Sequence, residues 1–465
     1  MDRLDTLSPL DGRYRDKIEP LINIFSEKGL MQYRIMVEGE YLIALSEHPE
    51  IALRPFTESE KRLIRNLQCL TIIDARIIKL IEMSGYRDRG ATHHDVKAIE
   101  YFMKDHFETT TLRNATKWVH FALTSEDITN IAYGLMLSEA LGVIIIPLIE
   151  KLHRVIEGYA LEYKDISMLG RTHEQPASPT TLGKEFKVFA ARLTRQVIQL
   201  RNHTILTKLN GAVGNYNAHY VSYPKVNWIE FTKNFIESFN RNRIIRLEPN
   251  LITTQIEPHD TYAELFDILR RLNTILLDFQ QDIRRYISDN WLIIKSRSGE
   301  IGSSTMPHKI NPKEFENAKG NLILANAILT CFSSQLPVSL LQRELFDSTI
   351  ERNFGTALGY SLVGYTSILD GLGKITVNKE SIVRALEEHP EITTEALQTI
   401  LRREGYEGAY EKLYQLVHGQ KVTKEGLEKI ISGLAIPEEI KNELKNITIN
   451  NYTGLARQLV GVDIN

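Results

Sequence analysis

The sequence predicts an all-α protein built around long helices. Apolar residues recur at steps of three and four over residues 182–200 and again over residues 265–283, a spacing that lines one face of a helix. Both runs are long and nearly heptad, which favours a helix bundle or coiled-coil packing. The sequence contains no long alternating pattern typical of β-strands and no strand–helix–strand rhythm. We therefore expect an all-α fold with a bundle of long helices at its centre.

Composition places the chain among ordinary soluble proteins. Its 465 residues leave room for two or three domains, 43% of them are hydrophobic, and 25% are charged. The net charge of −3 offers no basic excess for nucleic acid or an anionic membrane. Cys69 and Cys331 are the only cysteines, which fits a reducing compartment. No signal peptide is visible, and the apolar run 143–149 is too short to span a bilayer. We expect a cytoplasmic enzyme or scaffold.

Five polar or Gly/Pro-rich segments separate the predicted helices. They are residues 85–92, 170–179, 211–223, 257–260 and 299–312. The second of these is expected to place His173 in a turn at the start of a helix. From about residue 377 the predicted helices become shorter and more charged, which indicates a separate small domain.

The segment 302–312 is the most informative of these breaks. Two serines follow Gly302, two prolines forbid a continuous helix, and Lys309 and Asn311 lie close by. Glycine lets successive backbone N–H groups approach an anion, while Lys309 adds positive charge and Asn311 adds both a donor and an acceptor. So dense a cluster predicts a functional loop carried by a rigid scaffold.

Other polar residues gather at predicted helix starts. Thr124 and Ser125 open an apolar helical face over residues 128–135, and such a start can bind a carboxylate or phosphate. Taken alone, however, the same residues are an ordinary helix cap. Arg343 and Arg352 lie near hydroxyl residues, but in isolation the better interpretation is a pair of solvated surface cations. His173 alone could be either a satisfied polar residue or a catalyst.

A metal site is disfavoured by the residue pattern. His93 and His94 stand beside Asp95, but adjacent histidines point in different directions on a helix. There is no HExxH motif and no third ligand at a standard spacing. Residues 211–214 lack the spacing of a nucleotide-binding loop, so a turn is the better interpretation.

These segments together resemble the fumarase/aspartase superfamily, whose members cleave C–N or C–O bonds and release fumarate. In finer detail the pattern is similar to the adenylosuccinate lyase family of the longer bacterial type. The resemblance runs from the N-terminus to about residue 355 and is weaker through the tail. The matching segments are residues 8–14, 94–98, 124–127, 211–219, 253–260, 302–312 and 347–349.

The resemblance implies a fold and an assembly. It implies three helical domains, at residues 1–113, at 114–371 with the catalytic loop 299–312, and at 372–465. The central domains of four chains would form a twenty-helix core in a homotetramer, with each active site built from three subunits. Long heptad-like faces, which we expect a single chain not to bury easily, agree with this assembly. No metal, cofactor, nucleic acid or membrane partner is implied.

The resemblance also implies the chemistry. Adenylosuccinate would give AMP, and succinylaminoimidazole carboxamide ribotide would give aminoimidazole carboxamide ribotide, each by β-elimination of fumarate in purine nucleotide biosynthesis. Ser303 would act as base and His173 as acid, with Glu316 orienting His173. The residues expected to bind the nucleotide end are Arg13, Tyr14, Arg343, Ser348 and Arg352. Those expected around the succinyl part and the acid are Thr124, Ser125, Gln255, Lys309, Asn311, His93, His94 and Asp95.

Two positions depart from the pattern of the family, and four alternatives stay open. Position 93 is His where Asn is common, and position 174 is Glu where Gly is common. The nearest rivals are an argininosuccinate lyase-like or fumarase-like enzyme and the carboxymuconate cycloisomerase branch of the superfamily. A catalytically dead helical scaffold is a third rival, although it would be expected to lose Ser303, His173 or Lys309. A zinc hydrolase using residues 93–95 is the weakest.

Overall fold

The computed structural model describes residues 3–296, 299, 305–419 and 422–463. The chain divides into two compact units, each assembled from three segments. Unit 1 comprises Met1–Ile149, Gln196–Thr274 and Ala318–Thr366, and unit 2 comprises Glu150–Arg195, Ile275–Asn317 and Ser367–Asn465. The described residues are mostly helical, so the expected all-α class is confirmed. The three sequence domains stay a prediction.

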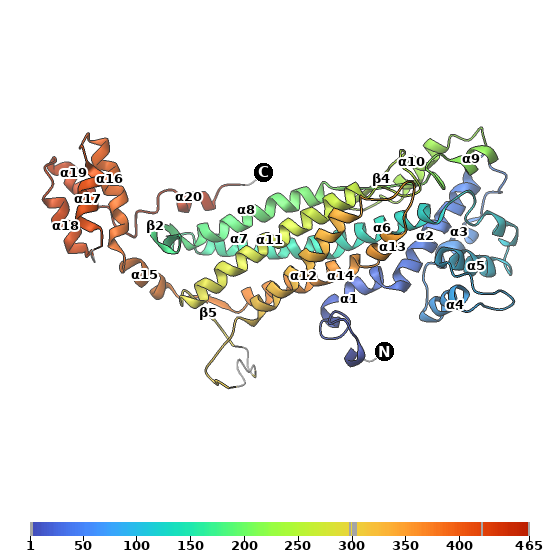
Figure 1. Cartoon of the computed structure of the whole chain (residues 1–465), viewed down its shortest axis with the longest axis horizontal. Coiled ribbons are helices and arrows are strands. Elements are labelled where there is room, and N and C mark those ends of the chain that lie inside the picture. Colours follow the sequence, from blue (N-terminus) through green and yellow to red (C-terminus); the bar gives the residue numbers. More distant parts are fainter. Residues whose placement is uncertain (1–2, 297–298, 300–304, 420–421, 464–465) are drawn as a thin grey trace. The chain divides into compact units, whose positions relative to one another are not determined.

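The helices fall into three groups (Figure 1). Those within unit 1 are α1 (Arg15–Phe25), α2 (Glu27–Glu47), α3 (Glu58–Asn66), α4 (Ile72–Met83), α5 (Asp95–Phe107), α6 (Ser125–Glu139), α9 (Asn217–Ser222), α10 (Trp228–Ser238) and α13 (Phe346–Glu351). Those with residues in both units are α7 (Ile146–Glu162), α8 (Leu182–Arg201), α11 (Asp260–Ser288), α12 (Lys313–Gln335) and α14 (Phe354–Leu372). Those of the tail are α15 (Lys379–Glu387), α16 (Thr394–Arg403), α17 (Ala409–Val417), α18 (Lys424–Ser432), α19 (Glu438–Lys445) and α20 (Ala456–Val460).

Short elements complete the described fold. Short 3₁₀ helices lie at Arg3–Asp5, Arg113–Trp118 and Pro390–Thr393, and a π-helical segment at Ala140–Ile145 joins α6 to α7. The strands form three pairs: antiparallel β1 (Ser167–Thr172) with β2 (Gln175–Thr181), parallel β3 (Thr204–Thr207) with β4 (Arg246–Pro249), and antiparallel β5 (Leu292–Ile294) with β6 (Ile375–Val377).

The predicted helical faces are correct, but the expectation that a single chain could not easily bury them is wrong. Leu182 and Leu193 of α8 and Leu265 and Leu276 of α11 are fully buried. Phe279 of α11 packs edge-on against Phe186 of α8, with ring centroids 5.9 Å apart. The long helices therefore satisfy one another within the chain, because their apolar stripes face each other.

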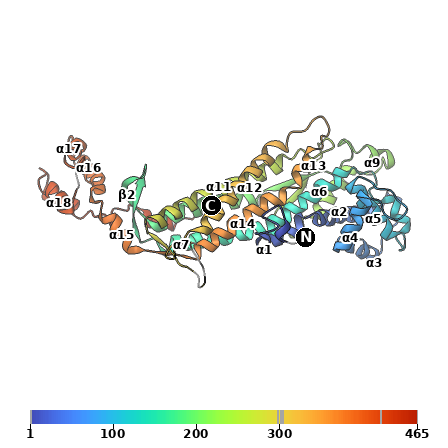
Figure 2. The ribbon, with the colours of Figure 1, turned by 60° about the horizontal axis from the view of Figure 1, so that its bottom comes forward.

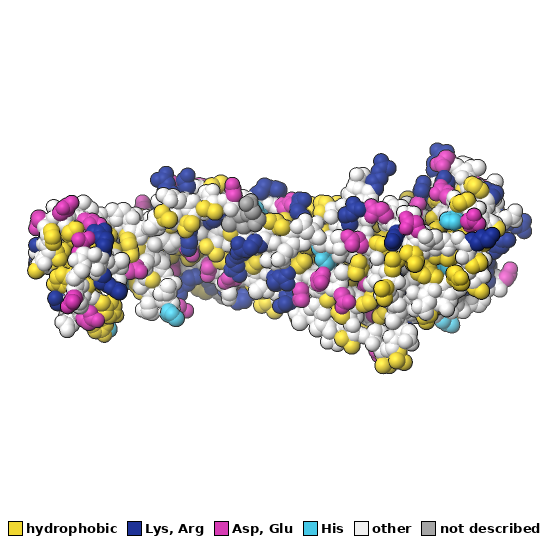
Figure 3. Space-filling model, turned by 90° about the horizontal axis from the view of Figure 1, so that it is seen from above, with side chains coloured by type: hydrophobic (Ala, Val, Ile, Leu, Met, Phe, Trp, Pro, Cys, Tyr) yellow, Lys and Arg dark blue, Asp and Glu magenta, His cyan; other side chains and the backbone are white. Residues whose placement is uncertain are grey.

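The longest apolar stretch belongs to the core. Ser125–Glu162 is long and apolar enough to cross a membrane, but its most apolar part is mostly buried inside the protein. A helix that is apolar all round and buried is a core helix. On the face shown in Figure 3, basic and acidic side chains are interspersed, in keeping with the net charge near zero.

The tail has a small core of its own. Leu397 and Leu401 of α16 pack with Leu413 of α17, Ile431 of α18 and Leu444 of α19. Figure 2 shows α16, α17 and α18 grouped together. A separate set of buried leucines and isoleucines lets the tail helices pack on one another, but the tail as a separate domain stays a prediction.

His173 lies in a hairpin turn, so the expected helix-start turn is wrong. The antiparallel register pairs Thr172 with Gln175, which leaves His173 and Glu174 as a two-residue loop. Both residues have positive φ, at 50° and 62°, as a type I′ turn requires. The sequence signal was weak because such turns usually carry Asn-Gly, and because Pro176 disfavours a strand interior. Glycine at position 174, common in the family pattern, would meet this geometry without strain.

Candidate active site

His94 and Ser125 meet in unit 1. His94 is the N-cap of α5, where its Nδ1 accepts a hydrogen bond from the Lys97 N–H at 3.2 Å. The Nε2 of the same ring lies 3.3 Å from Oγ of Ser125, the first residue of α6. Two helix N-termini therefore meet at this point, with Thr124 as the N-cap of α6. The positive ends of two helices favour an anionic group nearby. His93, at φ 47°, is exposed.

Asp95 lies between two guanidinium groups. Its Oδ2 is 2.7 Å from Nη1 of Arg34 and 2.9 Å from Nη2 of Arg352. Burial opposes ionisation, but the charge and hydrogen bond of Arg34, a bond from the Val96 N–H and the charge of Arg352 lower the pKa of Asp95 to about 2. Asp95 is therefore ionised at neutral pH and fixes the direction of Arg352.

Sequence reasoning missed Arg34, which is almost completely buried in α2. The available signal was a single arginine within an apolar helical stretch, because a buried arginine needs an anionic partner.

Arg343 is held by two buried carboxylates. Its Nη1 lies 2.8 Å from Oε2 of Glu126, and its Nη2 lies 3.4 Å from Oδ1 of Asp347. The same Asp347 oxygen accepts a hydrogen bond from the Ser348 N–H at 2.6 Å. The structure thus brings Arg343 and Ser348 together through Asp347, and it links them to α6, the helix that begins at Ser125.

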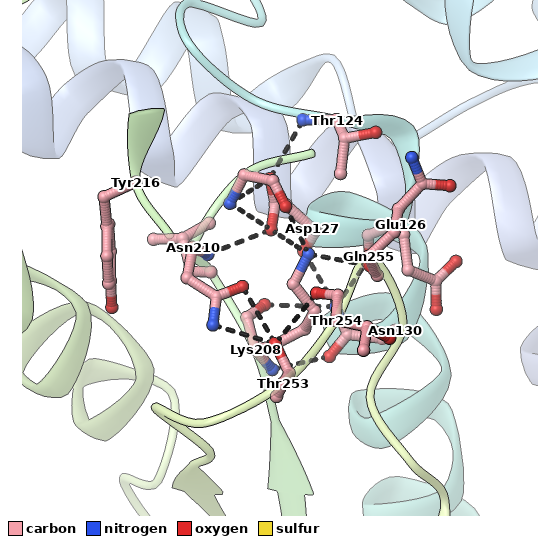
Figure 4. A network of polar contacts seen from close by, with 12 residues as sticks. Thr124, Glu126, Asp127, Asn130, Lys208, Asn210, Tyr216, Thr253, Thr254 and Gln255 are labelled. Atoms are coloured by element: carbon pink, nitrogen blue, oxygen red, sulfur yellow. Dashed lines mark hydrogen bonds and ion pairs between the residues drawn. The ribbon is translucent and has the colours of Figure 1, made fainter. Parts of the chain in front are cut away.

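A fully buried ion pair joins three chain segments near Thr124 (Figure 4). Nζ of Lys208 lies 2.8 Å from Oδ1 of Asp127 and donates to the carbonyl oxygens of Gly211 and Gln255, at 2.9 and 2.8 Å. Asp127 in turn accepts from the Thr124 N–H at 2.9 Å. The Gln255 N–H donates to the carbonyl of Gln342 at 3.2 Å. Gln255 is therefore fixed next to the residue that precedes Arg343.

A second buried cluster is connected to Arg343 through Glu126. A carboxylate oxygen of Glu126, a ring nitrogen of His259 and a carboxylate oxygen of Glu351 all lie within 4.8 Å of one another. By geometry this group could hold a metal ion, but Arg343 already contacts Glu126 and opposes a further cation by charge. Glu351 directly precedes Arg352 and lines a small cavity of about 110 Å³ with it. A larger cavity, of about 1000 Å³, lies in the tail and includes none of the expected site residues.

Tyr14 and Arg13 precede α1. Tyr14 packs with Leu10, Ile18 and Val363 in a small apolar cluster of unit 1. Arg13 is exposed. The role of both residues at the nucleotide end of the substrate stays a prediction.

The remaining expected residues lie in unit 2. His173 is exposed at the β1–β2 turn, Lys309 is exposed, and Asn311 is half-buried just before α12. Glu316, in the first turn of α12, lies 3.5 Å from Nη2 of Arg284. Its expected hydrogen bond to His173 stays a prediction. Ser303 lies outside the described residues.

Comparisons with known proteins decide the family. A family model described as "Lyase" matches residues 12–328, and one described as "Adenylosuccinate lyase C-terminal" matches residues 339–453. The chain is 45% identical to adenylosuccinate lyase of Escherichia coli (strain K12), over 99% of each chain. It is 44% identical to that of Haemophilus influenzae, again over 99% of each.

The chain belongs to the adenylosuccinate lyase family. The resemblance seen in the sequence is therefore confirmed, and membership of this family argues against the argininosuccinate lyase-like and scaffold alternatives. Solved structures of lower identity share the fold. They include 3-carboxy-cis,cis-muconate lactonizing enzyme from Pseudomonas putida (TM-score 0.72, 21% identity, 95% of each chain) and fumarate lyase from Mesorhizobium sp. BNC1 (TM-score 0.70, 17% identity, 96% of each chain).

Proposed function

We propose that the chain is a carbon–nitrogen lyase that splits adenylosuccinate into AMP and fumarate. The same site would release fumarate from succinylaminoimidazole carboxamide ribotide, and both reactions belong to purine nucleotide biosynthesis. The observation that carries the proposal is near-full-length identity of 44–45% to adenylosuccinate lyases. The arginine–carboxylate cluster of unit 1, which suits a doubly anionic phosphate, supports it.

The reaction is a β-elimination. A base removes the proton from the carbon next to a carboxylate, the C–N bond breaks as the C=C bond of fumarate forms, and an acid protonates the departing nitrogen. Ser303 is the proposed base, with its alkoxide stabilised by loop N–H groups and by Lys309. His173 is the proposed acid, oriented by Glu316. Loop closure would exclude water from the reacting atoms.

Binding would follow charge. Arg343, Arg352 and Ser348, helped by Arg13 and Tyr14, would hold the phosphate, because guanidinium groups bind phosphate in a bidentate manner. The N-termini of α5 and α6 would bind the succinyl carboxylates, because free backbone N–H groups and the helix dipole favour anions there. The proposed contacts of the succinyl part are Thr124, Ser125, Gln255, Lys309 and Asn311, with His93, His94 and Asp95 alongside.

We further propose a cytoplasmic homotetramer whose sites are shared by three subunits. Exposed apolar residues support a covering partner. Leu340, Leu341 and Leu345, which flank Arg343, expose 64, 78 and 70% of their surface, and α12 exposes Ile323 and Leu324. Contiguous exposed apolar residues beside functional groups are typical of an interface. His173, at the tip of an exposed hairpin, would suit a role in the site of another copy.

The test is an ultraviolet assay of adenylosuccinate cleavage. Ser303→Ala and His173→Ala should each lower kcat by about 10²–10⁴-fold, the usual loss when a general acid or base is removed, and both should still bind AMP. Ser304→Ala is the matched control and should stay close to wild type, because the neighbouring hydroxyl has no assigned role. Wild-type protein that cleaves neither succinyl nucleotide would refute the function, and a fully active Ser303→Ala would refute the base.

A further inference from the structure

His259 is a buried histidine that the mechanism does not use. His259 directly precedes α11 and is completely buried in unit 1. Its Nε2 lies 3.3 Å from Oε1 of Glu351. Its backbone has φ 65°, and its N–H donates to Oε2 of Glu257 at 2.7 Å. A left-handed conformation at a buried non-glycine residue is strained, and such strain gathers at functional sites when the surroundings over-determine the position.

The neighbours of His259 carry an excess of negative charge. Glu126, Glu257 and Glu351 are all buried, and Arg343 contacts one of them, Glu126. In Figure 4 the Glu126 carboxylate points away from the ion pair of Lys208 and Asp127, so that pair does not neutralise it. An uncompensated buried carboxylate is costly, and it would also weaken the field of the nearby arginines.

We propose that His259 is a cationic positioning residue that balances Glu126 and Glu351, and thereby keeps Arg343 and Arg352 able to bind the phosphate of the substrate. This inference rests on the proposed function, because it assigns His259 to the phosphate end of the same site. It deepens that function by naming the group that makes the phosphate site electrically positive.

The connections run from one imidazole to both arginines. Glu126 lies in the His259 cluster and contacts Arg343 at 2.8 Å. Glu351 is the other carboxylate of the cluster and the last residue of α13. Arg352 follows it directly as the C-cap of that helix. With the imidazolium present, both carboxylates have an inward partner. Without it, they would draw the two guanidinium groups inward and compete with phosphate for their N–H donors.

The protonation state of His259 supports the proposal. Burial alone would lower the pKa of His259, but the Glu351 carboxylate 3.3 Å away, followed by the charges of Glu126 and Glu257, outweighs burial and raises the pKa of His259 to about 9. Burial, then the charge of Glu351, raises the pKa of Glu126 against the opposing charge and hydrogen bond of Arg343. The charged form of His259 is therefore favoured at neutral pH.

The experiment uses a charge-compensated pair of variants. His259→Asn removes the cation but keeps a residue that tolerates left-handed backbone. We expect KM for adenylosuccinate, and the dissociation constants of AMP and inorganic phosphate by calorimetry, to rise roughly tenfold or more, with kcat changed less than about threefold. Adding Glu351→Gln removes one negative charge, and the double variant should regain binding to within about threefold of wild type.

His203 provides a matched control for His259. His203→Asn changes another buried histidine, outside the cluster, and should leave KM within about twofold of wild type. An unchanged KM in His259→Asn, or a double variant as impaired as the single one, would overturn the inference, since a purely steric role predicts no rescue by charge. A divalent metal present at one equivalent in the purified protein would overturn it too. All these results require an active wild type, whose inactivity would instead reject the proposed function.

Discussion

At the residue scale, the site depends on carboxylates that aim arginines. Asp95 contacts both Arg34 and Arg352, while Glu126 contacts Arg343. A flexible arginine side chain loses rotational freedom when it binds phosphate, and a carboxylate partner restricts it beforehand. These carboxylates therefore do more than compete with the substrate for guanidinium N–H donors. They set where the remaining guanidinium donors point.

Asp95 gives a prediction about acid stability. Its folded pKa of about 2 lies below the ordinary value of 3.8, so its contribution is present above pH 3.8 and is lost as pH falls toward 2. We expect this contribution to be about 2 kcal/mol at neutral pH. Asp95→Asn should lose it, and its urea unfolding curve should approach that of wild type as pH drops from about 5 to 3. A gap between the two proteins that stays constant over this range would contradict the assignment.

Burial of charged residues is the part of the site that sequence could not supply. Arg34, Lys208 and His259 look like surface residues when taken one at a time, since lysine and arginine are rarely buried. Their burial depends on partners far along the chain: Asp95 for Arg34, and Asp127 for Lys208. The residues that carry the family motif could be named in advance, whereas the residues that hold them in place could not.

At the element scale, the spacing of apolar residues predicted the long helices correctly. The long helices α8 and α11 follow the apolar spacing of the sequence, because burial of one stripe is what makes each helix stable. The hairpin of β1 and β2 escaped prediction because its two strands are short and its turn residues are unusual. The sequence therefore predicted the wrong kind of turn for His173, although it identified His173 as a candidate for the acid.

The ion pair of Lys208 and Asp127 gives a prediction for the elements it joins. Lys208→Met leaves Asp127 buried and unpaired, which should lower the free energy of unfolding by about 3–5 kcal/mol. It also frees the Gln255 carbonyl, so KM should rise. Adding Asp127→Asn should recover part of the stability, because the uncompensated charge disappears. Urea unfolding followed by circular dichroism measures both changes.

Lys225→Met is the matched control for this pair. Lys225 is an exposed lysine of unit 1, and its loss should change the free energy of unfolding by less than about 0.5 kcal/mol. If Lys208→Met unfolded at the same urea concentration as this control, the buried pair would not be what joins α6 to the 208–211 and 253–255 segments.

At the scale of the whole molecule, the proposed residues divide between the two units. The phosphate-binding candidates Arg343 and Arg352 lie in unit 1, whereas His173 and Glu316 lie in unit 2. Sharing of sites between subunits, which the family resemblance implies, would let one chain supply the acid and another the base. The apolar side chains exposed beside Arg343 agree with a neighbouring chain at that place.

Shared sites predict complementation between inactive variants. His173→Ala and Ser303→Ala should each be inactive alone, but chains of both kinds that are unfolded together and refolded should form mixed tetramers. If the two residues of a site come from different subunits, about a quarter of the sites in an equal mixture receive both native side chains, so about a quarter of wild-type activity should return. Each variant refolded alone is the control. A mixture as inactive as its components would mean that one chain supplies both residues, because then every site carries one of the two substitutions.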